Sequence, residues 1–150
     1  MTGNPLDDFT RQAVSVFGHL GSAGYYERLS ADGTPTATRC RSCQRVAFPP
    51  RAHCPSCFGT DVEWVPLPTE GSLYAFTTNK RGLRFAAPSV VGVVEIPEVG
   101  LVLGPIAGQL SDLRIGQPVR LEVIDVCDGL RFHHFVPADP SGEGEEAPCS

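Results

Sequence analysis

Four cysteines near the middle of the sequence have the type and spacing of a metal site. Cys40 and Cys43 form one C-x-x-C pair, and Cys54 and Cys57 form a second pair after ten intervening residues. Both sulfurs of such a pair can turn toward a common point, and two pairs supply four thiolates. Four thiolates suit one tetrahedral zinc ion and leave no coordination position open for a substrate. The pattern therefore predicts a structural zinc ribbon.

Other uses of these cysteines are chemically reasonable. The two pairs could form two disulfides, or one pair could act as a redox dithiol. A redox pair usually adjoins a βαβ pattern, which the flanking sequence lacks. His53 precedes Cys54 and could replace it as a ligand, although four cysteines already complete the site.

The remaining reactive side chains do not predict catalysis. His133 and His134 are neighbours on an expected strand, so they point to opposite faces and cannot easily share a metal. Cys127 lies where a strand is expected to end and is interpreted as a small buried hydrophobe, and Cys149 lies in the acidic tail. The sequence carries neither a convincing Ser-His-Asp set nor a Gly-rich phosphate loop. We therefore expect no catalytic residues on this chain.

Two helices are expected ahead of the cysteines. Apolar side chains in residues 5–20 recur at steps of three and four, and Asn4-Pro5 suits a helix start. A second helix is expected from Ala23 to Ser30, before the turn at Ala31-Asp32-Gly33. These helices either pack on their own domain or present an apolar stripe for docking on another subunit. The docking hypothesis assigns this stripe to Leu6, Phe9, Val16, Phe17, Leu20, Tyr25 and Tyr26.

The rest of the chain is expected to be mainly β. Short strands around the cysteines make a hairpin ribbon, and Pro66-Leu67-Pro68 reads as a stiff linker. On the next strand Leu73, Ala75 and Thr77 are expected to share one face. Five strands with a helical insert after the third predict an OB-type Greek-key barrel. The strands are Gly71–Asn79, Ser89–Ile96, Leu101–Ala107, Val119–Cys127 and Leu130–Val136, with the insert at Gln109–Ile115. The predicted division is 1–33 helical docking segment, 34–66 zinc ribbon, 67–138 OB fold and 139–150 disordered acidic tail.

Charge and hydropathy narrow the range of partners and compartments. The formal net charge is −5, with one lysine and eleven arginines, which argues against a nucleic-acid-binding surface. Arg39, Arg41, Arg45 and Arg51 surround the cysteines and either offset the negative charge of a zinc tetrathiolate or bind an anionic ligand. No apolar run approaches the ~20 residues that span a membrane, and no signal peptide is evident. Reduced thiols and these features predict a cytoplasmic protein.

The order of motifs resembles the zinc-ribbon/OB-fold family of proteins associated with acyl-CoA enzymes. The resemblance covers about residues 25–137. One departure is Gln44, where the family usually has glycine after the second cysteine. The matching stretches are Tyr25-Tyr26-Glu27-Arg28-Leu29, Cys40-x-x-Cys43, Phe48-Pro49-Pro50-Arg51, Cys54-Pro55-x-Cys57, Gly71-Ser72-Leu73-Tyr74, Ile115-Gly116-Gln117-Pro118-Val119 and Phe132–Pro137.

The resemblance implies an accessory subunit in a hetero-oligomer. Members resemble accessory subunits of thiolase-fold enzymes, which include thiolases, acyltransferases and lipid-transfer-protein-like aldolases of steroid degradation. In such complexes the resemblance implies that the thiolase-fold subunit carries the catalytic residues. The zinc ribbon is then rubredoxin-like, and the subunit holds the complex together and helps wall the channel for the CoA ester.

The segment Asn79–Pro88 between the first two barrel strands is a candidate contact site. Lys80, Arg81 and Arg84 lie there beside Phe85. The segment is expected either to contact CoA phosphates or the rim of the partner's active site, or to be a solvated loop. Two other functions stay open. One is nucleic-acid binding, and the other is a stand-alone acyl-CoA-binding protein or hydrolase.

Overall fold

The computed structural model describes residues 22–79, 89–127 and 130–138, and these form two compact units. The first unit ends at Pro66 and the second begins at Leu67. The helix predicted over residues 5–20 and the acidic tail lie outside the described residues. So do nine residues of the predicted contact surfaces: Leu6, Phe9, Val16, Phe17, Leu20, Lys80, Arg81, Arg84 and Phe85.

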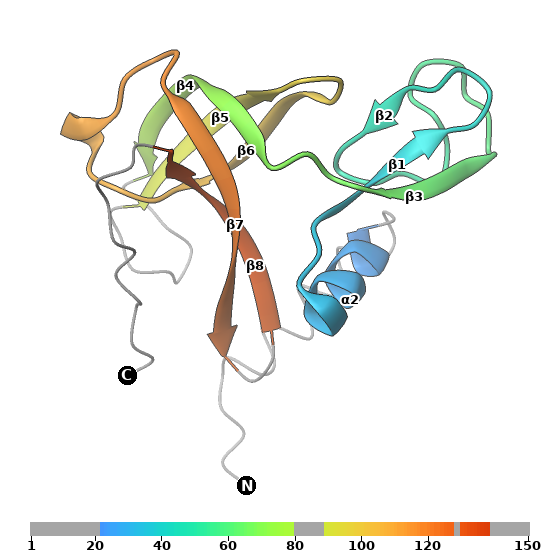
Figure 1. The fold of residues 1–150 in the computed structure, drawn as a ribbon, viewed down its shortest axis with the longest axis horizontal. Helices are drawn as coiled ribbons and strands as arrows, with labels where there is room; N and C mark the ends of the chain where they lie inside the picture. Colours follow the sequence, from blue (N-terminus) through green and yellow to red (C-terminus); the bar gives the residue numbers. More distant parts are fainter. Residues whose placement is uncertain (1–21, 80–88, 128–129, 139–150) are drawn as a thin grey trace, which may run out of the picture. The chain divides into compact units, whose positions relative to one another are not determined.

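The first unit combines one helix with a three-stranded antiparallel sheet. The helix α2 spans Ser22–Asp32, and the strands are β1 (Thr36–Cys40), β2 (Val46–Ala47) and β3 (Val62–Pro66), in the order β2-β1-β3 (Figure 1). The helix ends because Gly33 adopts a φ of 75°, and its amide donates to the Leu29 carbonyl at 2.9 Å. The turn expected at this glycine is therefore present.

Helix α2 packs on the ribbon through residues one turn apart. Tyr25 is 2% exposed and Leu29 is fully buried, and the Tyr25 ring meets Phe48 edge-to-face at 5.4 Å between ring centroids. The expectation that Tyr25 belongs to an exposed docking stripe is therefore wrong, because its ring fills the core of this unit. Tyr26 is half-buried, with its ring centroid 5.1 Å from that of Tyr25.

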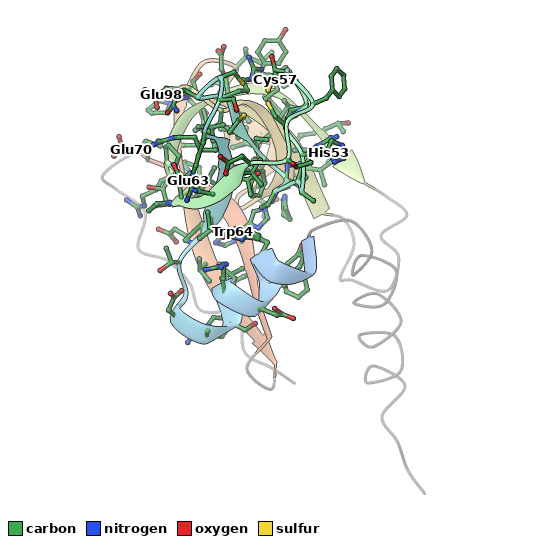
Figure 2. The ribbon with its side chains drawn as sticks, turned by 90° about the vertical axis from the view of Figure 1, so that its right-hand side faces the viewer. His53, Cys57, Glu63, Trp64, Glu70 and Glu98 are labelled. Carbon is green, nitrogen blue, oxygen red and sulfur yellow. The ribbon has the colours of Figure 1, made fainter. Side chains whose placement is uncertain are left out.

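The same helix also contacts Trp64, the single tryptophan of the chain. The Arg28 guanidinium carbon lies 4.6 Å from the centroid of the Trp64 ring, which is a cation–π contact. A side-chain carbon built at Gly24 would lie 3.0 Å from the same ring, so glycine permits this approach. Figure 2 shows Trp64 beside the helix. The sequence pattern did not predict this contact.

The second unit is a closed five-stranded barrel. Its strands are β4 (Glu70–Asn79), β5 (Ser89–Ile96), β6 (Gly100–Ile106), β7 (Pro118–Cys127) and β8 (Leu130–Pro137), with the 3-10 turn η1 at Leu110–Asp112 after the third strand. The barrel order is β4-β5-β6-β8-β7. Strands β6 and β8 pair in parallel, the other pairs are antiparallel, and β7 closes onto β4. This confirms the predicted fold class: a mainly β chain with a four-cysteine ribbon before a five-stranded OB barrel.

The barrel core depends on glycines that let large side chains reach the centre. Phe135 is fully buried, and a side-chain carbon at Gly104 would lie 2.9 Å from its ring. Gly92 leaves the same kind of space for Ile106, at 2.8 Å. The inner wall is completed by apolar residues from four strands: Leu73, Val94, Val102, Val119 and Leu121.

Strand β4 carries a β-bulge at Tyr74. Leu73 pairs with Val94 and Ala75 pairs with Val93, so Tyr74 has no partner in the ladder and is 56% exposed. A bulge shifts the alternation of side chains by one residue. Leu73 and Ala75 therefore face opposite sides of the sheet, and the expectation that they share a face is wrong.

Among the described residues, no helix is both long enough and apolar enough to cross a bilayer.

Candidate metal centre

The two cysteine pairs adopt the same backbone turn. The amide of Cys40 donates to the Arg45 carbonyl at 2.9 Å, and the amide of Cys54 donates to the Gly59 carbonyl at 2.8 Å. In each pair the residue after the second cysteine donates its amide back to the first cysteine, from Gln44 at 2.9 Å and from Phe58 at 3.0 Å. The ribbon is therefore built from two copies of one local motif.

Both turns place a non-glycine residue in the left-handed region of φ. Gln44 has a φ of 63° and Phe58 a φ of 60°. Such a conformation costs a non-glycine residue roughly 1–2 kcal/mol. At Gln44 the side-chain amide donates to the Arg41 carbonyl at 2.9 Å, which offsets part of this cost. The first turn therefore closes despite the missing glycine.

These turns bring the four sulfur atoms together. The Sγ atoms of Cys40 and Cys57 are 3.5 Å apart, as are those of Cys43 and Cys54, and all four lie within 4.8 Å of one another. Tetrahedral zinc with Zn–S bonds of about 2.3 Å requires S–S separations of roughly 3.8 Å. The four sulfurs therefore fit a single tetrahedral ion. His53 is exposed and does not belong to this group of ligand atoms.

Backbone amides favour the thiolate form in the second pair. The amides of Cys57 and Ser56 lower the pKa of the Cys54 thiol to about 6, and the Ser56 nitrogen lies 3.4 Å from its sulfur. At Cys43 the Arg45 amide also lowers the pKa, but the neighbouring thiols and burial together raise it. Four sulfurs this close cannot all ionise unless a cation sits among them. The site is therefore arranged for a divalent metal.

The site has a buried side and an exposed side. Cys40 and Cys54 are buried, whereas Cys43 and Cys57 are exposed. The Arg41 side chain forms ion pairs with Asp61 at 3.5 Å and Glu63 at 3.2 Å, so its charge is directed to carboxylates.

The two histidines of β8 lie in different surroundings, as the strand period predicts. His133 has its ring centroid 6.4 Å from that of Phe135, and burial, together with His134, lowers its pKa to about 4. His134 Nε2 lies 4.0 Å from a Glu122 carboxylate oxygen; burial lowers its pKa and Glu122 raises it in part. The two rings therefore do not form a joint site.

The fold and the site define a two-unit protein in which a four-cysteine ribbon precedes an OB barrel. Two family models match, and they match in this order. Residues 36–63 match the rubredoxin-like zinc ribbon domain of ChsH2, and residues 64–123 match the C-terminal OB-fold domain of ChsH2. The chain belongs to the zinc-ribbon/OB-fold family that these two ChsH2 domains describe, as the resemblance predicted.

Curated relatives include subunits named BbsA. The chain is 34% identical over 91 residues to the benzoylsuccinyl-CoA thiolase subunit BbsA of Thauera aromatica, and 29% identical over 84 residues to BbsA of Geobacter metallireducens. These matches cover 60% and 55% of this chain. The chain thus spans 63% and 57% of the lengths of these two relatives.

Solved structures with the same fold include a component of an enzyme complex. One chain in the structure titled "Ltp2-ChsH2(DUF35) aldolase" matches with a TM-score of 0.69 and 25% identity, over 79% of this chain and 95% of that one. A DUF35-family protein of unknown function from Sulfolobus solfataricus matches with a TM-score of 0.56 and 18% identity, over 90% of this chain and 99% of that one. The second match shows the fold alone.

Proposed function

We propose that this chain is a non-catalytic subunit that binds and stabilises a thiolase-fold enzyme acting on CoA esters. The observation that carries the proposal is the shared order of ribbon and barrel. The same two domains form a chain of the Ltp2-ChsH2 aldolase structure, and BbsA is named as a subunit of a CoA-ester thiolase. The catalytic residues would then lie on the partner.

We propose zinc as the metal, in a structural role. Four sulfurs within 4.8 Å of one another fill all the positions of a tetrahedral ion, so no position is left for a substrate. Strand β2 has only two residues, and among the described residues of this unit the buried side chains other than Tyr25 and Leu29 are mostly small. Metal binding would therefore supply much of the free energy that folds this unit. Cysteine ligands must stay reduced, which favours a cytoplasmic location.

Two sequence-based assignments extend the proposal to residues beyond the described ones. Lys80, Arg81 and Arg84, with Phe85, would contact CoA phosphates or the rim of the partner's active site. The stripe from Leu6 to Leu20 would dock on the partner. Replacing Lys80, Arg81 and Arg84 together with alanine should raise KM for the CoA ester in the assembled complex and leave kcat unchanged. An unchanged KM and unchanged partner affinity would remove the loop from the proposal.

Purification from the source organism tests the proposed function. A tagged chain expressed in its native cells should retain a thiolase-fold protein through size-exclusion chromatography in a fixed ratio, with one zinc per chain. The Cys40→Ser/Cys54→Ser variant, which removes one ligand from each pair, should lose both zinc and partner. A wild-type chain that elutes without any thiolase-fold protein would contradict the proposal.

A nucleic-acid-binding function has no support from the described residues of the barrel. The outer side of β5 and β6 carries Val91, Val93, Leu101 and Leu103, with Glu95 as its charged residue. Phosphate backbones are bound by lysine and arginine, and this side of the two strands offers neither.

A further inference from the structure

The outer side of strands β5 and β6 is largely apolar, and Ala75 of β4 extends this surface beside the polar Ser72 and Thr77. An antiparallel sheet usually faces water with polar residues. Cross-strand pairing places Ala75, Val93 and Leu103 in one row across the three strands. Leu103 is 71% exposed, and Leu101, two residues earlier, is 55% exposed. We call this surface the outer face of the barrel. It consists of Ala75, Val91, Val93, Leu101, Leu103 and Pro105.

This apolar character follows from the register of the strands. On β6 Val102, Gly104 and Ile106 face the inside of the barrel, so the alternate residues must point outward. Those alternate residues are Leu101, Leu103 and Pro105, and none of them is polar. An antiparallel sheet with one solvated face normally carries polar residues there. The barrel core therefore does not explain why leucine occupies two of these positions.

We propose that the outer face is a surface on which the thiolase-fold partner docks, in addition to the stripe from Leu6 to Leu20; this inference rests on the proposed function. Charge is the first argument for a protein occupant. Two cross-strand rows, Ala75-Val93-Leu103 and Thr77-Val91-Pro105, contain no charged side chain. Glu95 lies in the neighbouring row, between Ser72 and Leu101, at the border of the face. The cores of stable protein interfaces are depleted in charge in the same way.

The shape of the surface is the second argument. It lies on a sheet of three adjacent strands, each seven to ten residues long, so it suits an extended protein surface. Ladder hydrogen bonds on both sides hold β5 in place, which fixes Val91 and Val93 before a partner binds. A preformed apolar surface loses little conformational entropy when it is covered.

A charge placed at the centre of this face tests the proposal. In Leu103→Asp a carboxylate would be buried in an apolar interface, so partner affinity should fall at least 30-fold, which is the range of an interface hot spot. The matched control is Ile124→Asp, which changes an outward residue of β7 that pairs with Phe132 of β8. Both tagged variants and the wild-type chain are purified from native cells, and the thiolase-fold protein that each retains is quantified by mass spectrometry.

The outcomes separate the docking face from the proposed function. We expect the wild type and Ile124→Asp to retain the thiolase-fold protein and Leu103→Asp to lose it, with the circular dichroism of all three unchanged. If Leu103→Asp retains the partner as well as the wild type, the docking face is overturned while the proposed function stands. If the wild type retains no thiolase-fold protein, the proposed function fails. A wild-type homodimer that Leu103→Asp converts to a monomer would instead assign the face to a second copy and would also overturn the inference.

Discussion

The half-buried His133 of strand β8 predicts a specific loss of stability in acid. His133 lies near Phe135 and Gly104, and burial is the main reason why its pKa falls from 6.5 to about 4. A folded state that keeps imidazole neutral binds fewer protons than the unfolded chain between these two values. The contribution of His133 is therefore fully present above pH 6.5, and it is lost as the pH falls from 6.5 toward 4.

The magnitude follows from the two pKa values. Between pH 7.5 and pH 5, an unfolded pKa of 6.5 and a folded pKa of about 4 together predict a loss of about 2 kcal/mol in the free energy of unfolding. His134 adds to the effect in the same direction, since burial lowers its pKa as well, although Glu122 opposes this.

Urea denaturation of the wild type and of His133→Phe at pH 7.5 and pH 5 measures this loss. The variant keeps an aromatic ring but cannot titrate, so it should lose about 2 kcal/mol less than the wild type over this interval. Any constant effect of the substitution on packing or hydrogen bonding cancels between the two pH values. Equal losses in both proteins would show that the His133 imidazole is not kept neutral, and would refute the reasoning.

Three further predictions concern the metal, the ribbon core and the barrel core. Chelation of the metal should unfold the ribbon and shift the fluorescence emission of Trp64, the single tryptophan, to longer wavelength. The circular dichroism of the barrel should persist. An unchanged emission after proven metal loss would contradict a structural role for the metal. Leu29→Ala should destabilise the ribbon by about 2–5 kcal/mol, as measured by Trp64 fluorescence in urea, whereas the exposed Glu27→Ala on the same helix should cost less than about 0.5 kcal/mol. Gly71→Ala should cost the barrel about 1–3 kcal/mol because its new carbon would lie 2.6 Å from the Glu95 carbonyl oxygen; a thermal midpoint equal to that of the wild type would contradict this packing.

The sequence predicted the features that depend on local chemistry. Turn residues such as Gly100 interrupt the apolar runs, and the five barrel strands begin and end within one residue of the predicted positions. The spacing of the cysteines was sufficient to predict that the four sulfur atoms lie together, because two C-x-x-C turns converge on one point without help from distant residues. The helical insert was predicted longer than the three residues of η1.

Features that depend on contacts between elements were not predictable in this way. The bulge at Tyr74 cannot be recognised from the sequence, because this strand has apolar residues on both faces. The faces of Leu73 and Ala75 could therefore not be assigned correctly. Tyr25 reads as an apolar helix residue, and only the packing against Phe48 shows that it faces inward. The apolar outer face had one sequence signal. Leu101, Val102 and Leu103 are all apolar, which exceeds what a strand buried on one side requires.

Turnover of a CoA ester by this chain alone, by the purified thiolase-fold partner alone and by the two together tests the central claim most directly. The claim is that the chain binds and stabilises its partner enzyme and catalyses no reaction itself. It predicts no turnover by the isolated chain and a large gain in the activity or lifetime of the partner when the chain is added. Turnover by the isolated zinc-loaded chain would contradict it.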